Sequence, residues 1–475
     1  MIWRKLRLCP HDSKLQQKYS EIVHQWRALL RASEIAHEQR VIEAQDLGAF
    51  YRFVNKRISN RSCVGAIANP DGTILTNNCD RANAFNAYFS SVNVADNGSI
   101  PHCRSVLLTG ILDTITFDEK NVFNSIDKLK NNLSAGPDGL PPVLFKKLKY
   151  CLGRPLCMLY NQFISVGYVP CEWLNAVIVP VFKKGTAGQL CNYRPISLTC
   201  VPSKIMERML SCRIYAHLQS TSILHSSQHG FCKSRSTTTN LLECLSDWTL
   251  TILSSEQYVV AYIDFSKAFD VVSHPKLFAR LHSYGIRGTV LQWLKQFFTG
   301  RTHQTKIETA LSDLAVLLSG VVQGSGIGPL MFLVYINELI YILEEFNINV
   351  KLFADDVKMY MKIINDTNIT QLQRAVTFLV DWAHEWQLSI SVDKCCILNI
   401  GQQVVAPHIT INNSVLPLVP SVRDLGVVVC ADLSTTAHVA DIVAKAHKRA
   451  NLILHLCHVI LILLFVPTWL MSDLW

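Results

Sequence analysis

The stretch KLFADDVKMY at residues 351–360 constrains the fold of this chain more than any other. Apolar and polar residues alternate on both sides of Asp355 and Asp356, and such alternation predicts two short strands joined by a tight turn. Successive side chains of a strand point to opposite faces, so the apolar residues are expected on one shared side. These residues are Val350, Leu352, Val357 and Met359.

A further acidic residue ends another predicted strand. Residues 259–270 read VVAYIDFSKAFD, and the β-branched and aromatic run stops at Asp264. An acidic strand end and an acidic hairpin can meet across a sheet, where their oxygens would suit Mg²⁺. Two such ions can activate a 3′-hydroxyl and stabilise a leaving pyrophosphate, which indicates a polymerase. Paired aspartates also occur at solvated turns, so the surrounding segments decide between the two interpretations.

Those segments occur in a fixed order around the carboxylates. They are SAGPDGLPPVLFKKL (134–148), VIVPVFKKG (177–185), NYRPISL (192–198), QHGFCKSRST (228–237), YIDFSKAFD (262–270), GVVQGSGIGPLMF (320–332), LFADD (352–356), WQLSISVDKC (386–395) and VRDLGVVV (422–429). Together they resemble the reverse transcriptase domain of non-LTR (LINE-type) retrotransposons. The ordered set is much more specific than any single segment.

The resemblance implies a right-hand polymerase fold of the α/β (α+β) class, with fingers, a palm and a partial, truncated thumb. The palm would combine an antiparallel sheet with helices. We expect a helical N-terminal region and connector over 1–115, fingers over 116–257, a palm over 258–430, and a partial thumb with an apolar tail over 431–475. The activity implied is RNA-directed DNA polymerisation, in which dNTPs are added to a primer 3′-hydroxyl.

The resemblance also assigns the chemistry to particular residues. Asp264 and Asp355 would bind two Mg²⁺ ions, or Mn²⁺ in their place, with help from the backbone carbonyl of Phe265. Asp356 lies beside them as a further catalytic carboxylate. Lys394 matches a lysine that could protonate the pyrophosphate leaving group, although a solvated lysine is the plainer interpretation. Asp270 is expected to be a turn or cap residue rather than a third ligand.

A second set of residues would bind the incoming nucleotide. Arg194 and Lys183 lie on predicted finger strands, where cations can grip a triphosphate through charge-assisted hydrogen bonds. Phe269 matches the family's steric gate against a ribose 2′-hydroxyl, and the pair Gln323 and Gly324 matches its Gln-Gly contact. The plainer alternatives are surface cations and a core aromatic ring. The complete expected nucleotide-binding set is Arg194, Lys183, Phe265, Phe269, Gln323 and Gly324.

Composition agrees with a folded protein that has polyanionic partners. The chain has 475 residues, 49% of them hydrophobic, and a formal net charge of +9. The partners expected are an RNA template, a DNA primer and dNTPs. The sixteen cysteines include no C-x-x-C pair, and the start of the chain lacks the apolar core of a secretory signal. The first feature argues against zinc ribbons of the usual spacing. The second favours an intracellular location, in the nucleus or the cytoplasm, with reduced cysteines.

The ends of the sequence carry two expectations. Residues 1–115 show no resemblance to the endonuclease that LINE-type elements usually place upstream of the polymerase, so nicking would come from elsewhere or not occur. The apolar run LILHLCHVILILLFVPTWLM at 452–471 is interrupted by His455, His458 and Pro467. Spanning helices need about 20 predominantly apolar residues. The run is near that length, but because of these interruptions no membrane association is expected from it.

Two departures from the family pattern keep alternatives open. Cys232 stands where relatives usually carry arginine, and Val322 replaces a usual proline. The first alternative is therefore a catalytically inactive retrotransposon remnant that only binds nucleic acid. The second is a nuclease that uses the same carboxylates and two metal ions.

Overall fold

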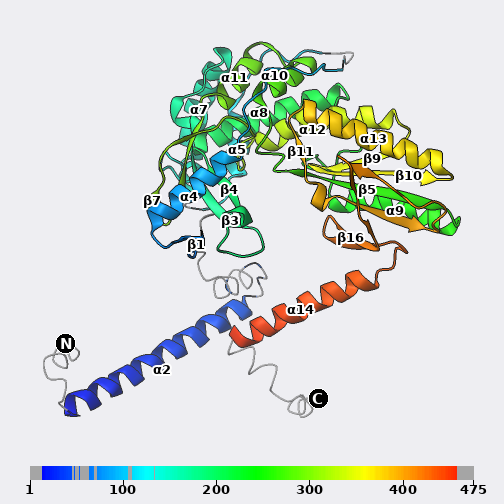
Figure 1. Ribbon diagram of the computed structural model, residues 1–475. Coiled ribbons are helices and arrows are strands. Elements are labelled where there is room, and N and C mark those ends of the chain that lie inside the picture. Colours follow the sequence, from blue (N-terminus) through cyan, green and yellow to red (C-terminus); the bar gives the residue numbers. More distant parts are fainter. Residues whose placement is uncertain are drawn as a thin grey trace, which may run out of the picture. The chain divides into compact units, whose positions relative to one another are not determined.

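The computed structural model describes residues 13–456 apart from positions 45, 47, 49–52, 54–63, 69–71, 105–109 and 133 (Figure 1). Contacts divide the chain into two units, one of residues 64–435 and one of residues 1–63 with 436–475. The larger unit runs across the boundaries expected near residues 115 and 257, so the division into fingers and palm stays a prediction. All candidate site residues lie in this larger unit.

A six-stranded sheet with the order β15-β12-β5-β10-β9 forms the centre of this unit, and β11 pairs with an end of β5. The pairings are antiparallel except that of β12 with β15. The predicted hairpin is confirmed as β9 and β10. The strands are β5 (Gln257–Ser266), β9 (Asn349–Phe353), β10 (Asp356–Ile363), β11 (Ser389–Ile390), β12 (Cys396–Gly401) and β15 (Leu418–Val419).

The central strand β5 carries apolar side chains on both sides, and these are buried. Helices therefore cover both faces of the central sheet. On one face Ala261 and Ile263 join the main core beneath α12 (Gly328–Glu344) and α13 (Asp366–Glu385). On the other face Val260 packs in a separate cluster with Trp248 of α9 (Thr237–Leu253). Figure 1 shows the sheet between these helices. Helix α13 follows the hairpin in the sequence and packs against β10.

A second sheet of five strands has the order β4-β3-β6-β7, with β8 paired to β6. Its strands are β3 (Asn175–Phe182), β4 (Tyr193–Leu198), β6 (Thr302–Ile307), β7 (Ala310–Leu311) and β8 (Ala315–Val316). Helix α4 (Asn78–Ser91) packs on it, with the rings of Phe85 and Tyr193 4.9 Å apart. The segment that we expected to be an irregular connector thus contains a helix with its own buried core.

Further helices complete the main core of the 64–435 unit. They are α5 (Glu119–Asp127), α6 (Pro142–Lys147), α7 (Lys149–Ser165), α8 (Val201–Ser220), α10 (His274–Ser283) and α11 (Gly288–Phe298), with 3₁₀ turns η1 (Cys171–Leu174), η2 (Leu190–Asn192) and η3 (Val392–Lys394). Three small hairpins pair β1 (Ile67–Ala68) with β2 (Ile74–Leu75), β13 (Thr410–Ile411) with β14 (Ser414–Val415), and β16 (Ser421–Asp424) with β17 (Val427–Cys430). The last of these contains the segment VRDLGVVV (422–429).

The other unit contains two long helices, α2 (Ser13–Glu43) and α14 (Thr436–Leu456). Helix α2 accounts for the helical pattern predicted near the N-terminus. Within the described residues, no helix combines the length and apolar character that crossing a membrane requires. Most of the apolar run at 452–471 lies outside the described residues, and so does most of the predicted tail.

Candidate active site

The three aspartates come together at one end of the central sheet. Asp356, the first residue of β10, lies directly opposite Asp264 of β5 in the antiparallel register. Asp355 precedes it in the two-residue turn that joins β9 to β10. The expected meeting of strand end and hairpin is therefore confirmed. The resemblance assigns metal binding to Asp264 and Asp355, and this assignment stays a prediction. The register places Asp356 directly across from Asp264.

The hairpin turn is held from outside by Gln228. Its Oε1 accepts hydrogen bonds from the backbone N–H groups of Gly230 and Ala354, at 2.8 Å and 3.0 Å. A Cβ atom on Gly230 would lie 2.3 Å from the backbone nitrogen of Ala354, so the approach requires glycine. Ala354 itself has a positive φ of 59°, a conformation that such contacts must stabilise. Sequence reasoning missed Gln228, although the segment QHGF had been singled out.

Electrostatic repulsion concentrates at the carboxylates. Burial, and then the charge of Asp264, raise the pKa of Asp355, while Lys183 and Arg194 oppose the shift. Desolvation, followed by the charges of Asp355 and Asp264, raises the pKa of Asp356 to about 6. Like charges at close range add to the effect of burial in disfavouring ionisation of Asp355 and Asp356. A bound cation would relieve this repulsion between the carboxylates.

Cationic side chains border this acidic site. Lys394, at the end of η3, donates a hydrogen bond from Nζ to Oδ2 of Asp264 over 2.6 Å. The backbone supports this approach, since the N–H of Ser391 donates to the carbonyl oxygen of Asp264 over 2.8 Å. Desolvation, and then the charges of Arg194 and Lys394, lower the pKa of Lys183. The structure therefore brings these three expected cations within electrostatic reach of the carboxylates.

The Gln-Gly pair connects the two sheets. Gln323 donates from Nε2 to Oδ1 of Asp270 over 2.6 Å, and its carbonyl oxygen accepts from the N–H of Ser197 in β4 over 2.8 Å. Gly324 has a φ of +107°, and a Cβ there would lie 2.7 Å from the carbonyl oxygen of Ser197. Asp270 is a turn residue, as expected, with its N–H bonded to Lys267. Its carboxylate as the partner of Gln323 was not foreseen.

The two phenylalanines have different surroundings. Phe265 is 2% exposed and belongs to the main core, so only its backbone can reach the acidic face. The half-buried ring of Phe269 stacks on Phe332 with centroids 4.2 Å apart, and the edge-on ring of Phe231 lies 6.0 Å away. Packing thus accounts for the position of Phe269, and its role as a gate stays a prediction.

The carboxylate oxygens of the three aspartates are suitable ligands for a hard cation such as Mg²⁺, but they do not form a complete coordination shell. Among the residues that the structure describes, no group of three or more His, Cys, Asp or Glu side chains is arranged to hold a metal ion. Mg²⁺ is usually held by one or two carboxylates, and water and substrate phosphates supply the remaining oxygens. The paired carboxylates of Asp264 and Asp356, with Asp355 in the adjoining turn, fit that kind of site.

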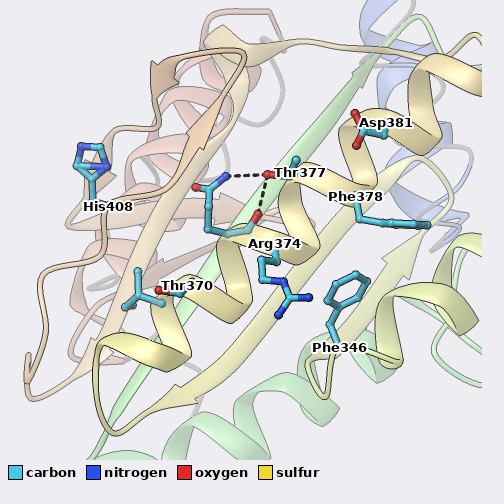
Figure 2. A pocket seen from close by; sticks show the side chains of 9 residues that line it. Phe346, Thr370, Arg374, Thr377, Phe378, Asp381 and His408 are labelled. Atoms are coloured by element: carbon cyan, nitrogen blue, oxygen red, sulfur yellow. Dashed lines mark hydrogen bonds between the residues drawn. The ribbon is translucent and has the colours of Figure 1, made fainter.

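A shallow cavity of about 520 Å³ lies elsewhere, along α13 (Figure 2). Its lining residues are Phe346, Ile369, Thr370, Gln373, Arg374, Thr377, Phe378, Asp381 and His408. Figure 2 shows Gln373 and Thr377 hydrogen-bonded to one another on successive turns of this helix. None of the expected catalytic or nucleotide-binding residues lines the cavity, so it is separate from the candidate active site.

Comparison with known proteins decides the family. Residues 181–429 match the family described as reverse transcriptase (RNA-dependent DNA polymerase), and this match covers more than half of the chain. The chain belongs to the reverse transcriptase family. The matched residues include Asp264, Asp355 and Asp356, which form the acidic end of the central sheet.

Related reverse transcriptases come from non-LTR retrotransposons, which confirms the resemblance. The RNA-directed DNA polymerase from mobile element jockey of Drosophila funebris is 25% identical over 460 residues, covering 91% of this chain and 49% of that protein. The probable RNA-directed DNA polymerase from transposon BS of Drosophila melanogaster is 25% identical, covering 70% of this chain and 37% of that protein. The chain thus spans about half or less of the length of these relatives.

Proposed function

We propose that this chain is an RNA-directed DNA polymerase of the non-LTR retrotransposon type. It would extend the 3′-hydroxyl of a DNA primer with dNTPs, copy an RNA template and release pyrophosphate inside the cell. The observation that carries the proposal is the direct pairing of Asp264 with Asp356 beside the turn residue Asp355. This is an acidic site at a sheet end in a chain of the reverse transcriptase family.

Asp264 and Asp355 would hold the divalent ions, with Asp356 and the carbonyl of Phe265 as further oxygen donors. Bound Mg²⁺ or Mn²⁺ would supply activation of the primer 3′-hydroxyl and charge stabilisation at the leaving pyrophosphate. Lys394 hydrogen-bonds to Asp264 at 2.6 Å, and its ammonium would deliver a proton to the departing pyrophosphate once that carboxylate has engaged the metal.

The nucleotide would enter from the side of the second sheet. Lys183 directly follows β3, and Arg194 lies on β4, which pairs with β3. The charges of both residues lower the pKa of Asp355. They would bind the triphosphate, while Gln323 and Gly324 line the approach to the new base pair. Phe269 would exclude a ribose 2′-hydroxyl. In this assignment residues 116–257 act as fingers, 258–430 as the palm and 431–475 as part of the thumb.

The test is primer extension on an RNA template with Mg²⁺ and dNTPs. We expect extension by the wild type and by Asp381→Asn, an exposed aspartate of α13, and none by Asp264→Asn or Asp355→Asn. A wild type that binds primer–template but never extends it would contradict the proposal and favour an inactive remnant. Cleavage of nucleic acid without dNTPs would instead indicate a nuclease.

A further inference from the structure

A charged pair is buried directly beside the catalytic carboxylates. Strands β5 and β10 pair residue by residue, and every second pair projects to the same face. The pair next to Asp264 and Asp356 on that face consists of Tyr262 and Lys358. Lys358 is only 2% exposed, so its ammonium is almost completely removed from water.

The partner of Lys358 comes from another hairpin. Asp424, the last residue of β16, accepts hydrogen bonds from Lys358 Nζ at 2.9 Å and 3.2 Å, and its Oδ2 accepts a third from the hydroxyl of Tyr262 at 3.2 Å. Both charged side chains are 3% exposed. Strands β16 and β17 form a two-stranded sheet of their own. These hydrogen bonds therefore join that hairpin to the two strands that carry the carboxylates.

The ammonium of Lys358 is also linked to β9, the other strand of the acidic hairpin, through Asn240. Lys358 also donates to Oδ1 of Asn240 in α9. Asn240 in turn donates from Nδ2 to the carbonyl oxygen of Leu352 in β9 over 3.1 Å. One buried network thus connects β5, β9, β10, β16 and α9 immediately behind the acidic site.

Stability alone does not account for an ion pair at this position. Removing two charges from water costs free energy, and apolar replacements of buried pairs are often neutral or stabilising. The next pair on the same face, Val260 and Tyr360, packs in an apolar cluster with Trp248. The charges instead lie beside the carboxylates, where position matters for catalysis.

We propose that Lys358 and Asp424 are positioning residues for the polymerase site. Their ion pair fixes the Asp264–Asp356 pair and attaches the 421–430 hairpin next to it. This inference rests on the proposed function and deepens it. Lys358 and Asp424 act through the carboxylates and the hairpin, without touching substrate.

The experiment compares Lys358→Met, Asp424→Asn and the double variant Lys358→Met/Asp424→Leu in the full chain. Each single variant leaves one buried charge unpaired, so we expect the double variant to have a higher unfolding midpoint than either single variant. Its kcat should nevertheless stay lower than that of the wild type by about tenfold or more, because small displacements of catalytic groups cost large rate factors. The KM for dNTP should change little. Hydrogen exchange of residues 421–430 should be faster in the double variant than in the wild type.

A matched control lies on the same strand. Lys362 of β10 pairs with Glu256 at the far end of the same face, with side chains 41% and 35% exposed. Lys362→Met/Glu256→Gln should leave kcat and the exchange of residues 421–430 unchanged. A double variant with wild-type kcat and exchange would overturn the positioning role.

The two proposals can fail separately. If wild type and control bind primer–template but do not extend it, the polymerase proposal fails. The exchange measurement still decides whether the ion pair holds the hairpin, since it needs no activity. Faster exchange confined to the Lys358 and Asp424 variants supports that role, and unchanged exchange overturns it.

Discussion

Lys394 and Asp264 form an ion pair at the centre of the acidic site, with Nζ and Oδ2 2.6 Å apart. The lysine side chain is 60% exposed and the aspartate 28%, so water and ions can reach both. An ion pair of this kind contributes about 1 kcal/mol or less. The carboxylate expected to bind metal is thus held in place by a partner that a divalent cation can displace.

Lys394→Met should lower the Mg²⁺ concentration at half-maximal activity, because Asp264 no longer exchanges a partner for the metal. The shift should be at most about fivefold, the factor for 1 kcal/mol. The maximal rate should fall as well if Lys394 protonates pyrophosphate. Lys149→Met, which breaks a 2.8 Å pair with Asp127 on another helix, should change neither. If the Mg²⁺ dependence of Lys394→Met equals that of the wild type, the metal does not displace Lys394 from Asp264.

Gly324→Ala should destabilise the fold and raise the KM for dNTP. The residue has a φ of +107°, and its new Cβ would lie 2.7 Å from the carbonyl oxygen of Ser197. Gly300→Ala is the matched control, since its φ is +68° with no atom within 4 Å. Denaturant unfolding should show the larger loss for Gly324→Ala, with about 1–3 kcal/mol expected for such strain. Equal losses would show that Ser197 tolerates the contact.

Asp270→Asn should change how stability depends on pH. Burial raises the pKa of Asp270 to about 6, against the opposing effects of Gln323 and Lys267. A folded-state pKa above the unfolded value of 3.8 means that the contribution to stability is complete below pH 3.8 and is lost as the pH rises through 6. The wild type should therefore lose about 2 kcal/mol relative to Asp270→Asn between pH 4 and pH 7. If the unfolding free energies of the wild type and Asp270→Asn change in parallel over that pH range, the pKa of Asp270 is not raised.

Gln228→Met should leave the N–H groups of Gly230 and Ala354 without their acceptor. Each buried unpaired group costs about 1–3 kcal/mol, so both the unfolding midpoint and kcat should fall. Gln373→Met in α13 removes a similar pair of hydrogen bonds, at 2.7 Å and 3.0 Å, to the backbone of Thr410 rather than to the hairpin turn. That control should lower the midpoint only. A normal kcat in folded Gln228→Met would show that the turn needs no support from outside.

The acidic hairpin could be predicted because the pattern that specifies it lies in neighbouring residues of the sequence. Alternation around Asp355 and Asp356 specifies two strands and a turn, and the apolar residues must then face the core. The register between β5 and β10 is not local. A shift by one residue would move Asp264 to the other face, and packing of α9, α12 and α13 on the two faces excludes that shift.

Contacts between distant polar side chains could not be predicted from pattern. Asp270 and Gln323 are 53 residues apart, and Lys358 and Asp424 are 66 apart, yet each pair is in direct contact. Neither lysine nor aspartate carries a periodic signal that predicts its burial. Similarly, α4 lies in a segment rich in turn-forming residues, and its packing on the second sheet overrides that local tendency.

The sequence by itself determined the family, the hairpin and the identity of the three aspartates, because ordered motifs and strand alternation are properties of neighbouring residues. The tertiary structure alone decided which aspartate faces Asp264, what Lys394, Gln323 and Gln228 bind, and that Lys358 is buried against Asp424. The physical reason is that these choices depend on strand register and on burial, which arise only when distant segments pack together.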